Sequence, residues 1–345
     1  MNIGIFKKLL NEHNKKTLND NLEQLLAEIM HESGAEAVIT EKGKDYTISR
    51  KYLCSALKQV KAAYSVQRMH YYLKRLIKSI TTVRTNRVND INLNRWQEYK
   101  NIYTDSLWIF PKRDSSGLHN AGYWGNFIPQ IPNQLLQRYT RENDWVIDPF
   151  AGMGTTLIEG KKLKRNVIGI ELQQKLVDKV NHMISRNYKD EAGYCRMYQG
   201  NSCTFAVDQL LKEHNLTCVQ HLILHPPYHD IINFSADKHC LSNLSEAAFF
   251  KAFTDIVLRF KNVLQPGRFL SLVIGDKYKA GEWIPLGFKA MQTVLEQGFS
   301  LKSIIVKNFD DTSAKRGSNE LWRYRALAGN FYIFKHEYIF IFQKK

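Results

Sequence analysis

Two short segments, about seventy residues apart, contain the residue types and spacings from which chemistry could follow. Residues 146–156 read VIDPFAGMGTT, and residues 224–228 read LHPPY. The first pattern predicts a buried strand that breaks into a glycine turn and continues as a helix from Thr155, which directs backbone N–H groups at a ligand. The second predicts a strand that ends in a rigid Pro-Pro turn and presents an aromatic ring.

The glycine turn differs from two other nucleotide-binding loops. A dinucleotide fingerprint needs a third glycine, but here Gly152-x-Gly154 is followed by two threonines and a leucine. No Gly-Lys-Ser/Thr ending marks a phosphate loop. The next predicted strand, residues 166–171, ends in Glu171, nineteen residues past Gly152. A carboxylate in that place can accept both hydroxyls of a ribose.

From about Tyr123 to its C-terminus, the chain resembles the DNA amino-methyltransferase family, whose members use S-adenosylmethionine to methylate the exocyclic nitrogen of adenine or cytosine. Residues 124–132 (WGNFIPQIP) resemble the motif that closes over the methionine part of the cofactor, and residues 200–202 (GNS) resemble its adenine-binding turn. The motif order is that of one of the family's circular permutations. The resemblance implies that S-adenosylmethionine is bound by Asn126, Phe127, Ile128, Pro129, Asp148, Pro149, Phe150, Ala151, Gly152, Gly154, Thr155, Thr156, Glu171, Asn201 and Ser202.

The same resemblance assigns catalysis to the turn formed by His225, Pro226, Pro227 and Tyr228. The family usually has Asp, Asn or Ser in place of His225, and often Asp in place of Asn201. An aromatic amine is a poor nucleophile because its lone pair is delocalised into the ring, so the site must accept its hydrogens.

A neutral imidazole can accept one of these hydrogens and a protonated imidazole cannot. With an ordinary histidine pKa of about 6.5, the rate is therefore expected to fall below neutral pH. The Pro226 carbonyl would accept the other hydrogen, while Tyr228 stacks on a base rotated out of the duplex. Asp230 is an alternative acceptor.

The charge of the chain predicts a polyanionic partner, because the formal net charge is +16. Residues 50–100 hold twelve Lys and Arg against two acidic residues, and these cations interleave with tyrosines at helix-like intervals. They predict a helical phosphate-binding surface; the alternative is a solvated face of a helical hairpin. A second mixture of arginines and aromatic residues lies in residues 308–330. Nucleic-acid contacts are predicted at Lys58, Lys61, Arg68, Lys74, Arg75, Lys78, Lys315, Arg316, Arg323 and Arg325.

The coarse pattern along the chain predicts two domains. Residues 1–105 lack strand alternation and are expected to form a helical, basic, nucleic-acid-binding region. Residues 106–345 alternate strands and helices, which predicts an α/β methyltransferase domain with a doubly wound, Rossmann-like, seven-stranded sheet and its ligand at the C-terminal strand edge. The predicted strands lie around residue 146 and at residues 167–170, 197–198, 222–224, 269–275, 301–306 and 338–342.

The composition argues against several classes of protein. No apolar run of about 18 residues exists, so no membrane span is expected. Lys7 and Lys8 interrupt the apolar start of the chain, so no signal peptide is expected either. The protein is therefore expected to be cytoplasmic. The five cysteines are odd in number and form no C-x-x-C pair, which argues against a disulfide framework and a zinc site.

The combined motifs predict a site-specific DNA methyltransferase that acts on adenine or cytosine by base flipping, with DNA as partner and an associated restriction nuclease as a candidate partner. Three alternatives stay open. An RNA amino-methyltransferase would use the same cofactor and catalytic turn. A catalytically silent nucleic-acid-binding protein is raised by His225 and Asn201. A small-molecule methyltransferase is the third alternative, but that function would not explain the many basic residues.

Overall fold

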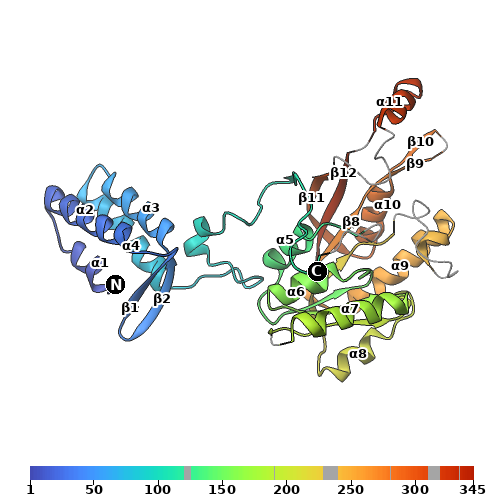
Figure 1. Cartoon of the computed structure of the whole chain (residues 1–345), viewed down its shortest axis with the longest axis horizontal. Helices are drawn as coiled ribbons and strands as arrows, with labels where there is room; N and C mark the ends of the chain where they lie inside the picture. Colours follow the sequence, from blue (N-terminus) through green and yellow to red (C-terminus); the bar gives the residue numbers. More distant parts are fainter. Residues whose placement is uncertain (120–125, 190, 228–239, 280, 310–318, 334) are drawn as a thin grey trace. The chain divides into compact units, whose positions relative to one another are not determined.

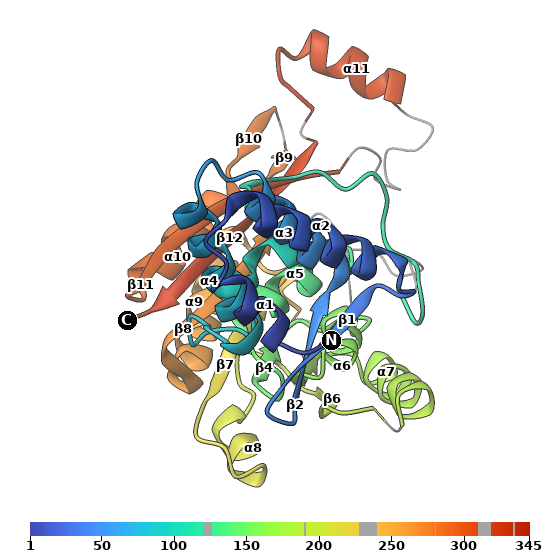
Figure 2. The same cartoon turned by 90° about the vertical axis from the view of Figure 1, so that its left-hand side faces the viewer.

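The computed structural model describes residues 1–119, 126–189, 191–227, 240–279, 281–309, 319–333 and 335–345. The chain forms two compact units, Met1–Asn101 and Ile102–Lys345, which are drawn in Figure 1 and, after a quarter turn, in Figure 2. Among the described residues, no helix combines the length and the apolar character needed to cross a bilayer.

The first unit packs its helices around one apolar core. Its elements are α1 (Gly4–Leu9), α2 (Lys15–His31), β1 (Glu36–Glu41), β2 (Lys44–Ser49), α3 (Arg50–Lys61), α4 (Val66–Thr81) and the 3-10 helix η1 (Leu93–Glu98). The side chains of Asn14, Ser49 and Ser65 cap the N-termini of α2, α3 and α4 by accepting backbone N–H groups. The core includes the fully buried side chains of Phe6, Leu22, Ile39, Leu53 and Leu73.

The expectation of helices alone in the first unit was wrong for residues 36–49, which form an antiparallel hairpin. Lys42 and Gly43 both have positive φ values, 50° and 78°, as the tightest hairpin turns require. Ala37 and Ile39 of β1 and Ile48 of β2 point into the helical core. An isolated hairpin is marginal in water, so this packing against helices stabilises it.

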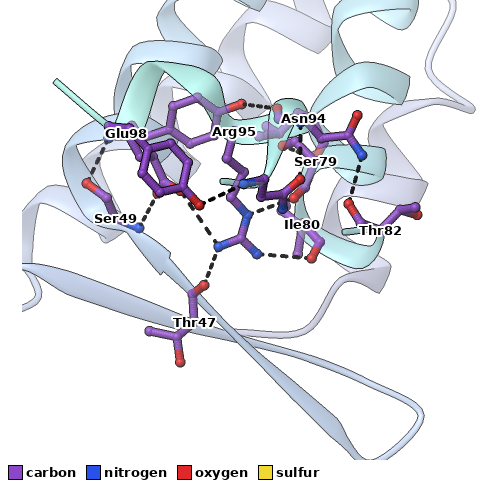
Figure 3. A network of polar contacts seen from close by, with 12 residues as sticks. Thr47, Ser49, Ser79, Ile80, Thr82, Asn94, Arg95 and Glu98 are labelled. Carbon is purple, nitrogen blue, oxygen red and sulfur yellow. Dashed lines mark hydrogen bonds and ion pairs between the residues drawn. The ribbon is translucent and has the colours of Figure 1, made fainter. Parts of the chain in front are cut away.

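Two arginines of the basic region hold the first unit together. The Arg95 guanidinium donates to the carbonyl oxygens of Ser79 (2.7 Å), Ile80 (3.1 Å) and Thr47 (2.5 Å), which joins the end of α4 to β2 (Figure 3). Arg50 donates to four backbone carbonyls, which belong to Ile29, Glu32, Ser33 and Glu36. Both arginines thus donate to carbonyl oxygens at helix C-termini, so these two cations stabilise the first unit.

The second unit is built on an eight-stranded sheet (Figure 1). All seven predicted strands are present, and a two-residue strand, β3, is added at one edge. β12 runs antiparallel to both of its neighbours, while every other neighbouring pair is parallel. The spatial order is β3 (Leu107–Trp108), β11 (Phe299–Asn308), β12 (His336–Lys344), β8 (Leu264–Ile274), β7 (Val219–Leu224), β4 (Trp145–Asp148), β5 (Asn166–Glu171) and β6 (Cys195–Gln199).

Helices cover both faces of this sheet, which explains why its central strands are apolar throughout. They are α5 (Gln130–Tyr139), α6 (Thr155–Lys162), α7 (Gln174–Asn187), α8 (Val207–Glu213), α9 (Glu246–Val263) and α10 (Leu286–Glu296). Side chains of α9, including Phe249, Phe253 and Phe260, fill the core beneath one face. Tyr139 of α5 stacks on His221 of β7 at the opposite face.

The sheet has the doubly wound, Rossmann-like α/β fold that the sequence predicts. Its strand order reverses between β4 and β7, and in open α/β sheets this switch point forms the ligand crevice at the C-terminal strand ends. A short hairpin of β9 (Lys277–Lys279) and β10 (Glu282–Ile284) follows β8, and α11 (Asn319–Ala328) lies between β11 and β12. The hairpin and α11 lie at the same end of the sheet (Figures 1 and 2).

Candidate cofactor and catalytic site

The turn after β4 is organised by the carboxylate of Asp148, which is fully buried. One of its oxygens accepts the backbone N–H of Phe150 (2.9 Å) and the other accepts the hydroxyl of Thr156 (2.5 Å). Burial raises the pKa of Asp148 to about 6, although both hydrogen bonds oppose this rise. Asp148 therefore shapes the glycine turn from beneath it.

Gly154 is required by the turn for two reasons. Its φ of 71° is a left-handed conformation that side chains disfavour. A Cβ atom at this position would also lie 2.5 Å from Cγ1 of Val180 on α7. The turn thus packs closely on α7, and the first residue of α6 follows at Thr155.

Glu171 ends β5 beside this turn. One of its carboxylate oxygens accepts the backbone N–H of Gly152 (3.1 Å), and the other accepts that of Gln173 (3.0 Å). Burial raises the pKa of Glu171, while these N–H groups lower it. Each carboxylate oxygen can accept a further hydrogen bond, so the two hydroxyls of a ribose could donate to Glu171 in addition to these N–H groups.

The predicted adenine-binding turn lies against the same region. The Ser202 hydroxyl donates to the carbonyl of Pro149 (2.5 Å), and the N–H of Gly200 donates to the carbonyl of Glu171 (3.0 Å). The Asn201 side chain accepts the N–H of Cys203 (2.9 Å). The turn after β6 is therefore bonded both to the glycine turn and to the strand that carries the acid.

Residues 126–129 connect the glycine turn with the catalytic turn. The Asn126 side chain accepts the hydroxyl of Thr155 (2.6 Å), and the ring of Phe127 lies 4.7 Å from that of His225. Phe127 is buried, and Ile128 and Pro129 lead directly into α5. The structure thus brings together three segments that are separated by up to a hundred residues in the sequence.

The Pro-Pro turn follows β7, and His225 is its half-buried first residue. Burial lowers the pKa of His225 to about 4; Glu337 raises this pKa and Lys307 lowers it. The sequence predicts that the imidazole of His225 becomes protonated near pH 6.5, but its lowered pKa moves this protonation to a much lower pH. At neutral pH the ring is uncharged, as an acceptor of an amine hydrogen must be. Tyr228 and Asp230 lie outside the described residues.

The sequence analysis missed a buried ion pair on the His225 side of the sheet. Lys307 and Glu337 are paired residues of β11 and β12, their charged groups are 3.1 Å apart, and their side chains are only 7% and 9% exposed. Lys307 and Glu337 each directly adjoin one of the predicted strands, 301–306 and 338–342, and these flanking charges were the available signal. The two charges act on the His225 imidazole in opposite directions, because Glu337 raises its pKa and Lys307 lowers it.

A second missed cluster surrounds Glu159 of α6, which is 2% exposed. Its carboxylate accepts from His119 (2.6 Å), Lys162 (2.8 Å) and Asn133 (2.7 Å). Burial alone would raise the pKa of Glu159, but these three donors outweigh it and lower the pKa. The cluster fastens the segment before residue 120 and helix α5 to α6. No group of three or more His, Cys, Asp and Glu residues within the described ranges is arranged to hold a metal ion.

The predicted nucleic-acid contacts fall on two helical regions. On α3 and α4, Lys58, Arg68, Lys74, Arg75 and Lys78 are exposed, while Lys61 pairs with Glu23 at 2.9 Å. On α11, Arg323 and Arg325 are exposed, and Arg325 lies 5.3 Å from the ring of Trp322. Lys315 and Arg316 lie outside the described residues.

The fold and the convergence of these motifs at its switch point define a Rossmann-like methyltransferase. The model of the DNA methylase family matches residues 6–182, more than half of the 345-residue chain. The chain therefore belongs to the DNA methylase family, as the sequence motifs predict.

Similar proteins match only over short stretches. The Type II methyltransferase M.MthZI of Methanothermobacter thermautotrophicus is 29% identical over 96 residues, which are 28% of this chain and 26% of that protein. M2.DpnII of Streptococcus pneumoniae is 33% identical over 87 residues, or 24% and 29% of the two chains. The chain thus spans less than a third of the length of these curated relatives. Among solved structures, TrmN from Thermus thermophilus is 15% identical with a TM-score of 0.42, over 64% of this chain and 49% of TrmN.

Proposed function

We propose that the protein transfers a methyl group from S-adenosylmethionine to an exocyclic amino group of adenine or cytosine in DNA. The observation that carries this proposal is the contact between Phe127 and His225, because it puts an uncharged acceptor beside the segment that borders the glycine turn. Membership of the DNA methylase family supports DNA as the substrate.

The chemistry of the described residues suits the ribose and methionine parts of the cofactor. The Glu171 carboxylate would hold the ribose, the glycine turn offers backbone N–H groups at the start of α6, and residues 126–127 would border the methionine part. When bound, S-adenosylmethionine supplies an electrophilic methyl group on a sulfonium. The site is at the C-terminal strand ends, where ligands of doubly wound sheets bind.

The catalytic turn would raise the nucleophilicity of the target amine. The neutral imidazole of His225 would accept one amine hydrogen and the Pro226 carbonyl the other, which shifts lone-pair density back to the nitrogen. Methylation would leave the amine cationic, and its excess proton would pass through the neutral imidazole of His225 to solvent. Tyr228 would stack on the flipped base, a role that rests on the motif alone.

Labelled S-adenosylmethionine, offered with duplex DNA and in parallel with tRNA, tests this proposal. Label in DNA alone supports it, whereas label in tRNA alone selects an RNA amino-methyltransferase. Cofactor binding without transfer to either substrate selects a silent binding protein. The designation of the relatives as Type II methyltransferases supports a restriction–modification setting, in which a nuclease would be the partner.

The exposed face of α4 is proposed as a DNA-binding surface. α4 contains no acidic residue, and the Arg68 guanidinium lies 4.7 Å and 4.8 Å from the rings of Tyr71 and Tyr72. Lys74 and Arg75 are exposed on this helix. An array of cations without acids attracts phosphates and releases counterions when it binds them.

Replacing Lys74 and Arg75 together with alanine is expected to weaken DNA binding and to reduce the slope of log affinity against log salt by about two, roughly one for each lost phosphate contact. Fluorescence anisotropy over a salt series measures both quantities. Lys16→Ala, at an exposed position on α2, serves as the control and should leave the slope unchanged. Equal slopes for the parent and the double variant would assign Lys74 and Arg75 to a solvated face.

A further inference from the structure

Arg113 has an unusual environment in the segment between β3 and α5. Its Nη1 donates to the carbonyl oxygens of Asn126 (3.1 Å) and Phe127 (3.0 Å). Its Nε and Nη2 are shielded from solvent and have no hydrogen-bond partner. Burial lowers the pKa of Arg113, yet a guanidinium stays protonated at any physiological pH. Arg113 is thus a half-buried cation that keeps two solvent-shielded donors, Nε and Nη2, unsatisfied.

Unsatisfied buried donors of a charged group are costly, so each requires an explanation, and a bound ligand that accepts their hydrogens is one. The two orphan nitrogens form one edge of the guanidinium plane, with parallel N–H bonds spaced to match the two oxygens of a carboxylate. No ion pair joins Arg113 to an acid in the ranges that the structure describes. The charge of the neighbouring Asp114 raises the pKa of Arg113, but the Asp114 carboxylate accepts the N–H of Ser116 (2.8 Å) and forms no ion pair with the guanidinium.

The location of Arg113 identifies the carboxylate. The two residues that it holds by their carbonyls are those that touch the glycine turn, through Thr155, and the catalytic turn, through His225. In the proposed function, the methionine part of S-adenosylmethionine lies along this segment. That part of the cofactor ends in an α-carboxylate, which is the anion the fork of Arg113 fits.

We propose that Arg113 binds the α-carboxylate of the cofactor through Nε and Nη2, while Nη1 fixes the backbone of residues 126 and 127. This assignment rests on the proposed function, because it presupposes that S-adenosylmethionine is the cofactor. One guanidinium then couples cofactor binding to the position of Phe127 against His225.

Calorimetry with two related ligands tests the assignment. S-adenosylhomocysteine carries the carboxylate, and its decarboxylated analogue keeps the adenosine, the thioether and the amine but lacks the carboxylate. Arg113→Met is expected to weaken binding of S-adenosylhomocysteine about 10- to 100-fold more than binding of the analogue, because only S-adenosylhomocysteine loses the charge-assisted pair, whereas both ligands lose the backbone contacts of Nη1. Arg113→Lys, which keeps the charge without the fork, should fall between the parent and Arg113→Met. Lys112→Met, at the exposed neighbouring residue, should match the parent for both ligands.

Two results would overturn the assignment while the proposed function stands. If Arg113→Met loses affinity equally for both ligands, Arg113 acts only through the backbone of residues 126 and 127. If the variant binds S-adenosylhomocysteine as tightly as the parent, the carboxylate lies elsewhere. If the parent binds neither ligand, the proposed cofactor is wrong and the assignment fails with it.

Discussion

His225→Ala is expected to lower the single-turnover rate of methyl transfer about 100-fold or more at saturating cofactor, because the target amine loses an acceptor in the transition state. Single-turnover conditions are needed so that product release does not hide the chemical step. Quench-flow measurement with labelled cofactor gives this rate. A variant as fast as the parent would exclude His225 as the acceptor, and Asp230 would be tested next.

The pH dependence of the parent provides a second readout of the same residue. Because burial lowers the pKa of His225 to about 4, the imidazole stays neutral as the pH falls through the ordinary histidine range. At saturating cofactor, the fall in rate that belongs to His225 is therefore expected only as the pH approaches 4, whereas protonation of Asp148, whose pKa is about 6, is expected to act on cofactor affinity. A rate that is halved near pH 6.5 would show that the imidazole is solvated in the active enzyme.

Gly154→Leu is expected to abolish cofactor binding. The new side chain would need a φ near 71° and would place its Cβ 2.5 Å from Val180, so the turn could not keep the shape that aligns its N–H groups. Calorimetry with S-adenosylhomocysteine measures the loss. Gly267→Leu is the matched control, since Gly267 has a φ of 77° with no atom within 4 Å of its Cβ position.

The control separates the cost of the left-handed backbone from the cost of the contact with Val180. It should bind the cofactor as the parent does, with only a lowered melting temperature. Unchanged affinity in Gly154→Leu would remove the glycine turn from the cofactor site. Loss of affinity in both variants would instead attribute the effect to a general disturbance of the second unit.

The strands and the order of the motifs could be predicted because apolar strands buried on both faces and glycine turns are local patterns. The hairpin at residues 36–49 was missed although its Lys42-Gly43 turn is also a local signal, since the helical composition around it dominated the interpretation. The short strand β3 has only two residues, and its pairing with Val306 and Lys307 of β11 comes from tertiary structure.

The roles of charged residues were harder to predict than the fold. The net charge of residues 50–100 predicts that they attract anions, but the sequence cannot show that the guanidinium groups of Arg50 and Arg95 donate to backbone carbonyls. Nor does it show that Arg113 keeps two donors unsatisfied or that Lys307 pairs with Glu337. Each of these facts depends on which distant carbonyl or carboxylate the fold brings within hydrogen-bond distance.

The central claim is methylation of an exocyclic amine in DNA, and mass spectrometry of nucleosides tests it most directly. DNA from a methylation-deficient host that expresses the protein would be compared with DNA from the same host that expresses His225→Ala. The account predicts N6-methyladenine or N4-methylcytosine in the first DNA and at most a trace of the same modified base in the second. Absence of both modified bases, with the protein folded and bound to S-adenosylhomocysteine, would contradict it.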